Sequence, residues 1–185
     1  MEDNNPYSDD PDVACMLRLK GGDLNAFDEI VKRWQSPLIN YFNRSVQPRE
    51  QAEDLAQMVF IRVYKAAAGY EARAKFSTYL FQIARHHLIN HYRHQSRRPL
   101  DLQDPAEMHA VSPEDSTIAI NDLEAVFEMT LERLPENQRT AILLLKQQEL
   151  SYQEIAEIMD ASEGAVKTWI FRARQFLKQA LKDFV

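Results

Sequence analysis

Hydrophobic residues recur every three or four positions along most of this chain, which is the period of amphipathic α-helices. The repeat is clearest in residues 17–34, 52–68, 76–94 and 123–134. We find no convincing run in which apolar and polar residues alternate strictly, as a half-buried strand requires. The pattern therefore predicts an all-α protein.

One segment interrupts this helical pattern. Residues 99–117 contain three prolines, several Asp and Ser residues and few large apolar side chains, a composition typical of linkers. A new apolar stripe follows, and Pro135 can open the next helix at its first position. We therefore predict a disordered acidic tail and two small helical domains joined by a flexible acidic linker. The predicted bounds are 1–12 for the tail, 13–98 and 121–185 for the domains, and 99–120 for the linker.

Composition adds limits rather than detail. Of the 185 residues, 45% are hydrophobic and 27% are charged, as in ordinary soluble globular proteins. The longest aliphatic run, residues 141–145, is far too short to cross a bilayer, and the acidic start lacks the features of a signal peptide. Cys15 is the only cysteine and cannot form an internal disulfide. We therefore expect a reduced, cytoplasmic protein that does not insert into a membrane.

The distribution of charge is more informative than the net charge of −6. Residues 72–100 contain six Lys or Arg residues and no acid, and residues 164–182 contain five and no acid. Between these blocks, residues 101–132 contain nine acids and no Lys or Arg. Because local fields govern the encounter with phosphates, the two basic blocks favour nucleic acid as a partner of this acidic chain.

Residues 151–174 predict a helix-turn-helix. Ser151 and Glu154 have the spacing of a capping box, which marks a helix start, and residues 160–162 break that helix. The second helix has one apolar face, and its other face presents side chains suited to base edges in the major groove. These side chains include Lys167, Thr168, Phe171 and Arg172. A basic hairpin whose charges are simply solvated would show the same local pattern, so that alternative remains open.

Five motifs in a fixed order make a family resemblance plain. They are GDLNAFDEIVKRW (22–34), AEDLAQMVFIRVYKA (52–66), FSTYLFQIARHHLINHYR (76–93), LERLPENQRTAILL (131–144) and LSYQEIAEIMDASEGAVKTWIFRAR (150–174). The chain resembles the bacterial extracytoplasmic-function (ECF) sigma factors, and the last motif is especially similar to their envelope-stress branch. The resemblance covers about 13–98 and 121–185, nearly everything except the tail and the linker.

The resemblance implies two roles for the N-terminal domain. It would dock on the clamp helices of the β′ subunit of core RNA polymerase, and it would open and capture the −10 promoter element. The implied polymerase-binding residues are Asp54, Gln57, Met58 and Arg62. The implied −10 DNA-binding residues are Tyr70, Lys75, Phe76, Tyr79, Arg85, His86, Asn90 and Arg93.

Segment 76–98 interleaves arginines and histidines with aromatic residues, which suits single-stranded DNA because that ligand needs a cationic track and flat faces for its bases. Four positions nevertheless depart from the family pattern. Met58 stands where an acid is usual, Tyr79 replaces a common Trp, His86 replaces a common Asn, and Asn90 replaces a common Asp. We therefore predict where DNA binds but not which base is selected.

The C-terminal domain, by the same resemblance, would sit on the β-subunit flap and read the −35 element. The implied −35 DNA-binding residues are Lys167, Thr168, Phe171, Arg172 and Arg174. Trp169 stands where a basic residue is often found, which leaves the −35 sequence open. The acidic linker would run through the polymerase, either mimicking nucleic acid or serving as a solvated spacer. An anti-sigma protein, often membrane-anchored in this family, is a further expected partner.

Two other function classes have to be weighed. A stand-alone helix-turn-helix regulator with a helical sensor or dimerisation domain would share the C-terminal motif. A metal-dependent enzyme could use His87, His91 and His94, whose spacing places them on one helix face. No carboxylate or thiol accompanies them in sequence, and no catalytic motif is present. The resemblance implies no catalytic residue, no cofactor and no metal.

Overall fold

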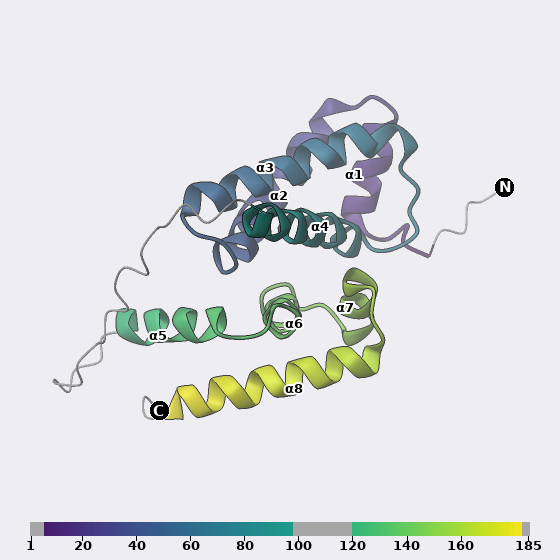
Figure 1. The fold of residues 1–185 in the computed structure, drawn as a ribbon. Helices are drawn as coiled ribbons and strands as arrows, with labels where there is room; N and C mark the ends of the chain where they lie inside the picture. The colour runs from purple at the N-terminus through teal and green to yellow at the C-terminus, as the bar shows by residue number, and fades with distance from the viewer. Residues whose placement is uncertain (1–5, 98–119, 183–185) are drawn as a thin grey trace.

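The computed structural model describes residues 6–97 and 120–182, and within these residues every regular element is helical (Figure 1). The first half contains α1 (Pro11–Lys20), α2 (Leu24–Asn43), α3 (Arg49–Ala66), the short 3-10 turn η1 (Ala67–Gly69) and α4 (Phe76–Arg97). The second half contains α5 (Ile120–Glu132), α6 (Glu136–Gln147), α7 (Tyr152–Met159) and α8 (Glu163–Ala180). The all-α prediction is confirmed.

Helix α1 begins earlier than we predicted. Asp10 accepts hydrogen bonds from the backbone N–H groups of Asp12 (2.9 Å) and Val13 (3.3 Å), and Pro11 occupies the first turn. An Asp cap followed by Pro is a strong helix start, because the proline ring presets the backbone and needs no donor there. Residues 6–9 form turns and α1 begins at Pro11, so the tail predicted over 1–12 is ordered from residue 6, while residues 1–5 lie outside the described chain.

The N-terminal domain, α1 to α4, is built around an aromatic core. Helix α2 packs on both α1 and α3, and α3 packs on α4. The ring of Trp34 lies 5.9 Å from that of Phe76 and 6.1 Å from that of Phe81, and Phe81 in turn meets Tyr41 at 5.4 Å. Edge-to-face ring contacts of this kind add to the large apolar area that such residues bury.

A buried carboxylate joins α1 to α2 in this domain. Asp12 is buried, accepts a hydrogen bond from the indole Nε1 of Trp34 (3.0 Å) and pairs with Arg33. Burial raises the pKa of Asp12, although the hydrogen bond from Trp34 and the charge of Arg33 oppose that rise. A buried charge needs such partners, so this group orients α1 against α2.

The C-terminal domain, α5 to α8, contains the predicted helix-turn-helix. Ser151 and Glu154 form the complete capping box at the start of α7, and Asp160 ends α7 in the left-handed conformation with φ 50°. Ser162 then caps α8 by accepting from the backbone of Ala165 (3.2 Å). These features confirm the motif. Pro135, expected at the first position of a helix, instead lies just before α6, which begins at Glu136.

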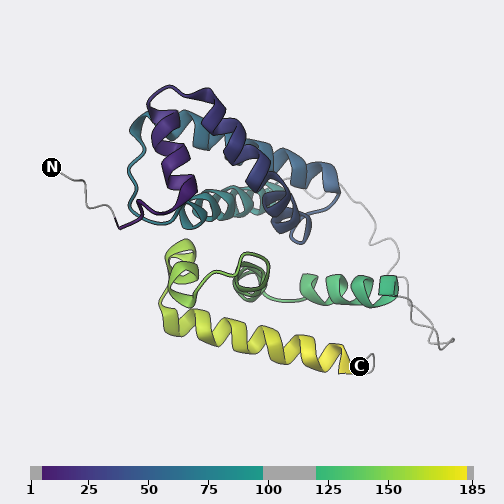
Figure 2. The same cartoon turned by 180° about the vertical axis from the view of Figure 1, so that it is seen from behind.

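The two domains contact each other along α4. Helix α4 lies between the other N-terminal helices and the C-terminal domain, packing against α7, while α2 touches α6 (Figures 1 and 2). The polar contacts across this boundary include Lys75 with Glu154 (2.9 Å), Gln82 Nε2 with the Glu157 carbonyl (3.3 Å) and Arg139 Nη2 with the Tyr92 hydroxyl (3.1 Å). Residues 99–119 of the predicted linker, 99–120, lie outside the described residues, and residue 120 begins α5.

Candidate polymerase and promoter interfaces

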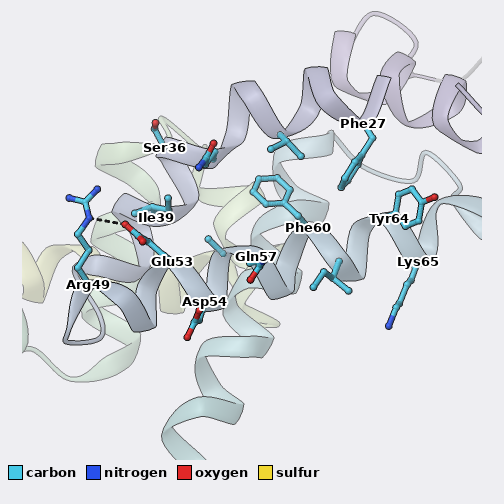
Figure 3. Close-up of a pocket in the computed structure, with 14 residues that line it drawn as sticks. Phe27, Ser36, Ile39, Arg49, Glu53, Asp54, Gln57, Phe60, Tyr64 and Lys65 are labelled. Atoms are coloured by element: carbon cyan, nitrogen blue, oxygen red, sulfur yellow. Dashed lines mark hydrogen bonds and ion pairs between the residues drawn. The ribbon is translucent and has the colours of Figure 1, made fainter. Parts of the chain in front are cut away.

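A groove of about 980 Å³ runs between α2 and α3 (Figure 3). Phe27 from α2 meets Phe60 at 6.5 Å and Tyr64 at 5.2 Å, so aromatic rings line part of the groove. Charged and polar side chains of α3 line the remainder, and Arg49 pairs with Glu53 at 3.0 Å. An apolar groove with polar groups at its margin can receive the side of a partner helix.

The four predicted polymerase-binding residues are all exposed on α3, and two of them line the groove. Asp54 and Gln57 line the groove, and Figure 3 shows Gln57 near Phe60. Met58 is 49% exposed outside the groove lining. The charge of Arg62 influences the pKa of Tyr79 on α4, so this residue lies near the predicted DNA-binding helix.

Sequence analysis missed the apolar part of this groove. Ile61 and Tyr64 both line it and remain 46% and 48% exposed. Exposed large apolar residues beside a concave surface are typical of an interaction site. Their helical spacing was visible in the sequence, but periodicity alone does not reveal which apolar positions of α3 are left uncovered.

A second hollow, of about 390 Å³, lies where η1 leads into α4. Its lining includes Tyr70, Arg73, Tyr79 and Gln82, and the rings of Tyr70 and Tyr79 meet at 5.4 Å. Burial raises the pKa of Tyr70 to about 12. The Tyr70 hydroxyl is buried and has no hydrogen-bond partner among the described residues. The hollow therefore combines flat rings with polar groups, as a pocket for an unstacked base requires.

The predicted −10 residues of α4 divide between different surroundings. Helical spacing places Tyr79, His86, Asn90 and Arg93 on one face, and each of these side chains is partly or fully exposed. Phe76 is fully buried against Trp34, so its side chain is not exposed in this structure as those of the other predicted residues are, and its contact with DNA stays a prediction. Its position at the start of α4 places its ring in the aromatic core.

The last two predicted −10 residues, Arg85 and Lys75, are engaged with other parts of the protein. Arg85 is half-buried near Tyr41. Burial raises the pKa of Tyr41, and the positive charge of Arg85 partly opposes that rise. Lys75 remains exposed but pairs with Glu154 of α7 at 2.9 Å. Hydrogen bonding to Glu154 raises the pKa of Lys75. Lys75 is therefore available to DNA only in competition with this carboxylate.

The histidine face does not assemble a metal centre in the described structure. No group of three or more His, Cys, Asp or Glu side chains within residues 6–97 and 120–182 could hold a metal ion. Burial lowers the pKa of His87, and the nearby charges of His86 and Arg62 lower it further. His87 is consequently protonated at a lower pH than an ordinary histidine.

On α8, all five predicted −35 residues are exposed and lie outside the buried stripe of the helix. Lys167, Thr168 and Arg172 are exposed, and Phe171 is 62% exposed. Lys167 pairs with Glu163 one turn earlier (2.7 Å), and the Thr168 hydroxyl donates to the Gly164 carbonyl (2.9 Å). The opposite face of α8 is buried against α6 and α7.

Arg174, the fifth predicted residue, is also exposed and borders a pocket. It borders an apolar pocket of about 430 Å³ in the C-terminal domain, lined among others by Phe127, Leu131 and Leu177. Arg44 of the N-terminal domain also borders this pocket, with its guanidinium 5.5 Å from the centre of the Phe127 ring. Arg174 therefore borders this pocket while sharing, by helical spacing, the side of α8 that carries Lys167.

Comparisons with known proteins identify the family of the two domains. Residues 30–98 match the family Sigma-70 region 2, and residues 125–177 match the family Sigma-70, region 4. The RNA polymerase sigma-H factor of Pseudomonas aeruginosa is 34% identical, over 94% of this chain and 95% of that protein. The ECF RNA polymerase sigma-E factor of Haemophilus influenzae is 33% identical, over 94% of this chain and 97% of that protein.

A solved structure supports the same fold. It is the sigma factor RpoE of Bartonella quintana in complex with the anti-sigma factor NepR. That sigma factor is 25% identical to this chain, with a TM-score of 0.69 over 84% of this chain and 96% of that one.

These observations define the class first: two helical domains that match sigma-70 regions 2 and 4 make this a sigma-70-type initiation factor. More specifically, the chain belongs to the ECF sigma factors. It is an alternative sigma factor that directs transcription initiation, with core RNA polymerase and promoter DNA as its partners. Within the described residues, no helix combines the length and apolarity needed to cross a bilayer.

Proposed function

We propose that three surfaces of this sigma factor divide the work of initiation. The groove between α2 and α3 receives the clamp helices of the β′ subunit, with Asp54 and Gln57 as polar contacts and Ile61 and Tyr64 as apolar ones. The hollow beside Tyr70 and the exposed face of α4 hold the melted −10 strand. The outward face of α8 reads the −35 duplex.

One observation carries the −35 assignment. Phe171 is 62% exposed at the centre of a cationic helix face, in the second helix of a helix-turn-helix. Exposing a large aromatic side chain to water is unfavourable unless a partner covers it. In the major groove its ring can contact a thymine methyl group, while Lys167 and Arg172 donate to guanine edges.

Four wider features belong to the proposal. Residues 13–98 act as the polymerase-docking and −10 domain, and 121–185 as the −35 domain. The protein works in the bacterial cytoplasm, where the polymerase and the chromosome are. It catalyses no reaction of its own, because its surfaces supply binding and positioning. An anti-sigma protein, as seen with the Bartonella quintana relative, would keep it inactive by covering the polymerase-binding groove.

A transcription assay tests the proposal directly. Purified bacterial core polymerase is supplied with fragmented genomic DNA, with and without this protein, and the 5′ ends of new transcripts are mapped. Discrete transcripts that share a −35 and a −10 sequence are expected only when the protein is present.

The competing hypothesis, a stand-alone regulator, predicts the opposite result. Such a protein would retard duplex promoter fragments without polymerase and would yield no new transcripts with it. That outcome would overturn the proposal and leave the α2–α3 groove as a sensor or dimerisation surface.

A further inference from the structure

Two side chains of α1 hold both ends of the loop that borders the proposed base pocket. The loop comprises residues 69–75, between η1 and α4. At its far end, Asp10 Oδ2 accepts a hydrogen bond from the backbone N–H of Phe76 at 2.9 Å. At its near end, Lys20 Nζ donates to the backbone carbonyl of Tyr70 at 2.9 Å. The two residues occupy opposite ends of α1, as its N-cap and its last residue.

Asp10 caps two helices at once. Its Oδ1 accepts from the backbone of Asp12 and Val13 at the start of α1, while its Oδ2 accepts from Phe76 at the start of α4. The first N–H groups of a helix lack intrahelical partners, and a negative charge there also complements the helix dipole. The two oxygens of one carboxylate therefore set the position of the first residue of α4 relative to α1.

Lys20 holds the other end of the loop by donating to the backbone of Tyr70 rather than to its side chain. The Tyr70 N–H already donates to the carbonyl of Ala67 at 3.1 Å, and the Tyr70 side chain is buried. The bond from Lys20 satisfies the Tyr70 carbonyl and completes the anchoring of this residue. Between the two anchors, Arg73, Ala74 and the ring of Tyr79 line the hollow of about 390 Å³.

We propose that Asp10 and Lys20 are positioning residues for −10 recognition. Neither lines the hollow, so neither contacts the captured base. Instead they make α1 a brace that keeps the 69–75 loop in the conformation that the base requires. A pocket that is formed before the base enters discriminates better between bases, because binding energy is not used to order the loop. This inference rests on the proposed function, since it assumes that the hollow receives a base of the −10 element.

The carboxylate of Asp10 permits a selective variant. Serine is about as good an N-cap as aspartate, so Asp10→Ser retains the cap of α1. Its single hydroxyl oxygen cannot also serve Phe76, so the tie to α4 is lost. Asp23→Ser is the matched control, because Asp23 caps α2 through Asn25 (3.0 Å) and forms its second contact with Arg18 instead of the loop.

Lys20 permits a parallel pair of variants. Lys20→Met retains most of the aliphatic stem and removes the donor, whereas Lys20→Arg retains a donor and should preserve the contact. Lys32→Met is the control, because Lys32 is exposed on α2 and does not line the α2–α3 groove.

The experiment measures base discrimination by the reconstituted holoenzyme. The promoter is one mapped in the transcription assay above, prepared with a pre-melted −10 region that carries either the natural base or a substitution at each position. We expect Asp10→Ser and Lys20→Met each to reduce the preference for the natural base by about tenfold, the size expected when one charge-assisted hydrogen bond is lost. Lys20→Arg, Asp23→Ser and Lys32→Met should discriminate as the wild type does.

Core-polymerase affinity and thermal stability are measured on the same variants. We expect each variant to bind core polymerase within twofold of the wild-type affinity and to melt close to the wild-type temperature. If discrimination, core affinity and stability fall together, the two ties are merely structural and the inference is overturned. If both variants discriminate like the wild type, the inference is also wrong, while the proposed function stands. If the wild type itself shows no preference at any −10 base, the proposed function fails first.

Discussion

Phe76 shows at the scale of a single residue how burial decides a role that chemistry alone leaves open. An aromatic side chain in a cationic segment suits single-stranded DNA, and so does the neighbouring Tyr79. The structure places Phe76 in the aromatic core and leaves Tyr79 at the edge of the hollow. Two aromatic residues one turn apart on α4 therefore differ in role: Phe76 stabilises the core, and Tyr79 lines a candidate site.

The contrast gives a stability prediction. Phe76→Ala should lower the free energy of unfolding by about 3–5 kcal/mol, because it removes a fully buried ring from a packed core. Phe171→Ala, on the exposed face of α8, should change it by less than about 0.5 kcal/mol. Urea unfolding followed by circular dichroism measures both. Equal effects for the two variants would mean that Phe76 is not in the core.

His87 gives a prediction about pH. Its folded pKa is lowered by burial and by the charges of His86 and Arg62, whereas an unfolded histidine titrates near pH 6.5. The unfolded chain therefore binds a proton before the folded one does, and the free energy of unfolding falls as the pH drops below about 6.5. Above about pH 8 the histidine is neutral in both states, and His87 makes no such contribution.

Comparing His87→Gln with the wild type isolates this contribution. Glutamine stays neutral, so the variant should lose less stability than the wild type when urea unfolding is repeated at about pH 7.5, 6.5 and 5.5. His94→Gln, at an exposed position of α4, is the control and should follow the wild type. Parallel curves for the wild type and His87→Gln would show that His87 is protonated equally in both states.

At the scale of elements, α8 combines a buried stripe with an outward cationic face. Val166, Ile170, Ala173 and Leu177 are buried on one side, and the predicted reading residues lie on the other. Local signals define this element well, because Ser162 caps its start and the turn at Asp160 ends the preceding helix. A recognition helix held this firmly can be altered on its outer face with little effect on the fold.

The outer face of α8 yields a transcription prediction. Lys167→Ala and Arg172→Ala should each weaken initiation that depends on the −35 element by about 1–3 kcal/mol, the usual size of a base contact. Lys178→Ala, an exposed change in the last turn of the same helix, should have a smaller effect. Multi-round transcription with matched and mutated −35 sequences measures the effect. Affinity for core polymerase should stay unchanged, and its loss would identify α8 as a docking or folding surface instead.

At the scale of the whole molecule, the closed contact between the two domains involves a candidate DNA-binding residue. Lys75 is 58% exposed and pairs with Glu154, which is 15% exposed. Burial alone would raise the pKa of Glu154, but hydrogen bonds from Lys75 and Ser151 outweigh it and the pKa lies below its ordinary value. The pair therefore consists of two full charges near neutral pH, and a DNA phosphate would compete for the Lys75 ammonium.

Glu154→Gln tests the strength of this contact with little disturbance of α7. Glutamine serves a capping box as glutamate does, so the start of the helix is retained while the charge is lost. We expect the domain contact to weaken by about 1 kcal/mol, because one partner of this ion pair, Lys75, is largely exposed to water. Fluorescence energy transfer between dyes on α3 and α8 should then report a larger open population, and added salt should produce the same change in the wild type. If the variant, and the wild type at high salt, both keep the distance distribution of the wild type at low salt, apolar packing of α4 on α7 holds the domains together.

The sequence by itself determined the features that depend on neighbouring residues. Helical periodicity, the Ser151–Glu154 capping box, the turn at Asp160 and the two basic blocks all rest on interactions within a few positions, so the all-α class and the helix-turn-helix were predictable. The signal for α1, Asp10 followed by Pro11, was also local and could have been used to begin that helix correctly.

Only the tertiary structure decided which side chains are covered and which distant residues meet. Phe76 and Arg85 share the composition of a DNA-binding segment, but packing places Phe76 in the core and Arg85 near Tyr41. The ties from Asp10 to Phe76 and from Lys20 to Tyr70 join positions 66 and 50 residues apart. No periodic pattern encodes such contacts, because they exist only once helices from different parts of the chain have packed together.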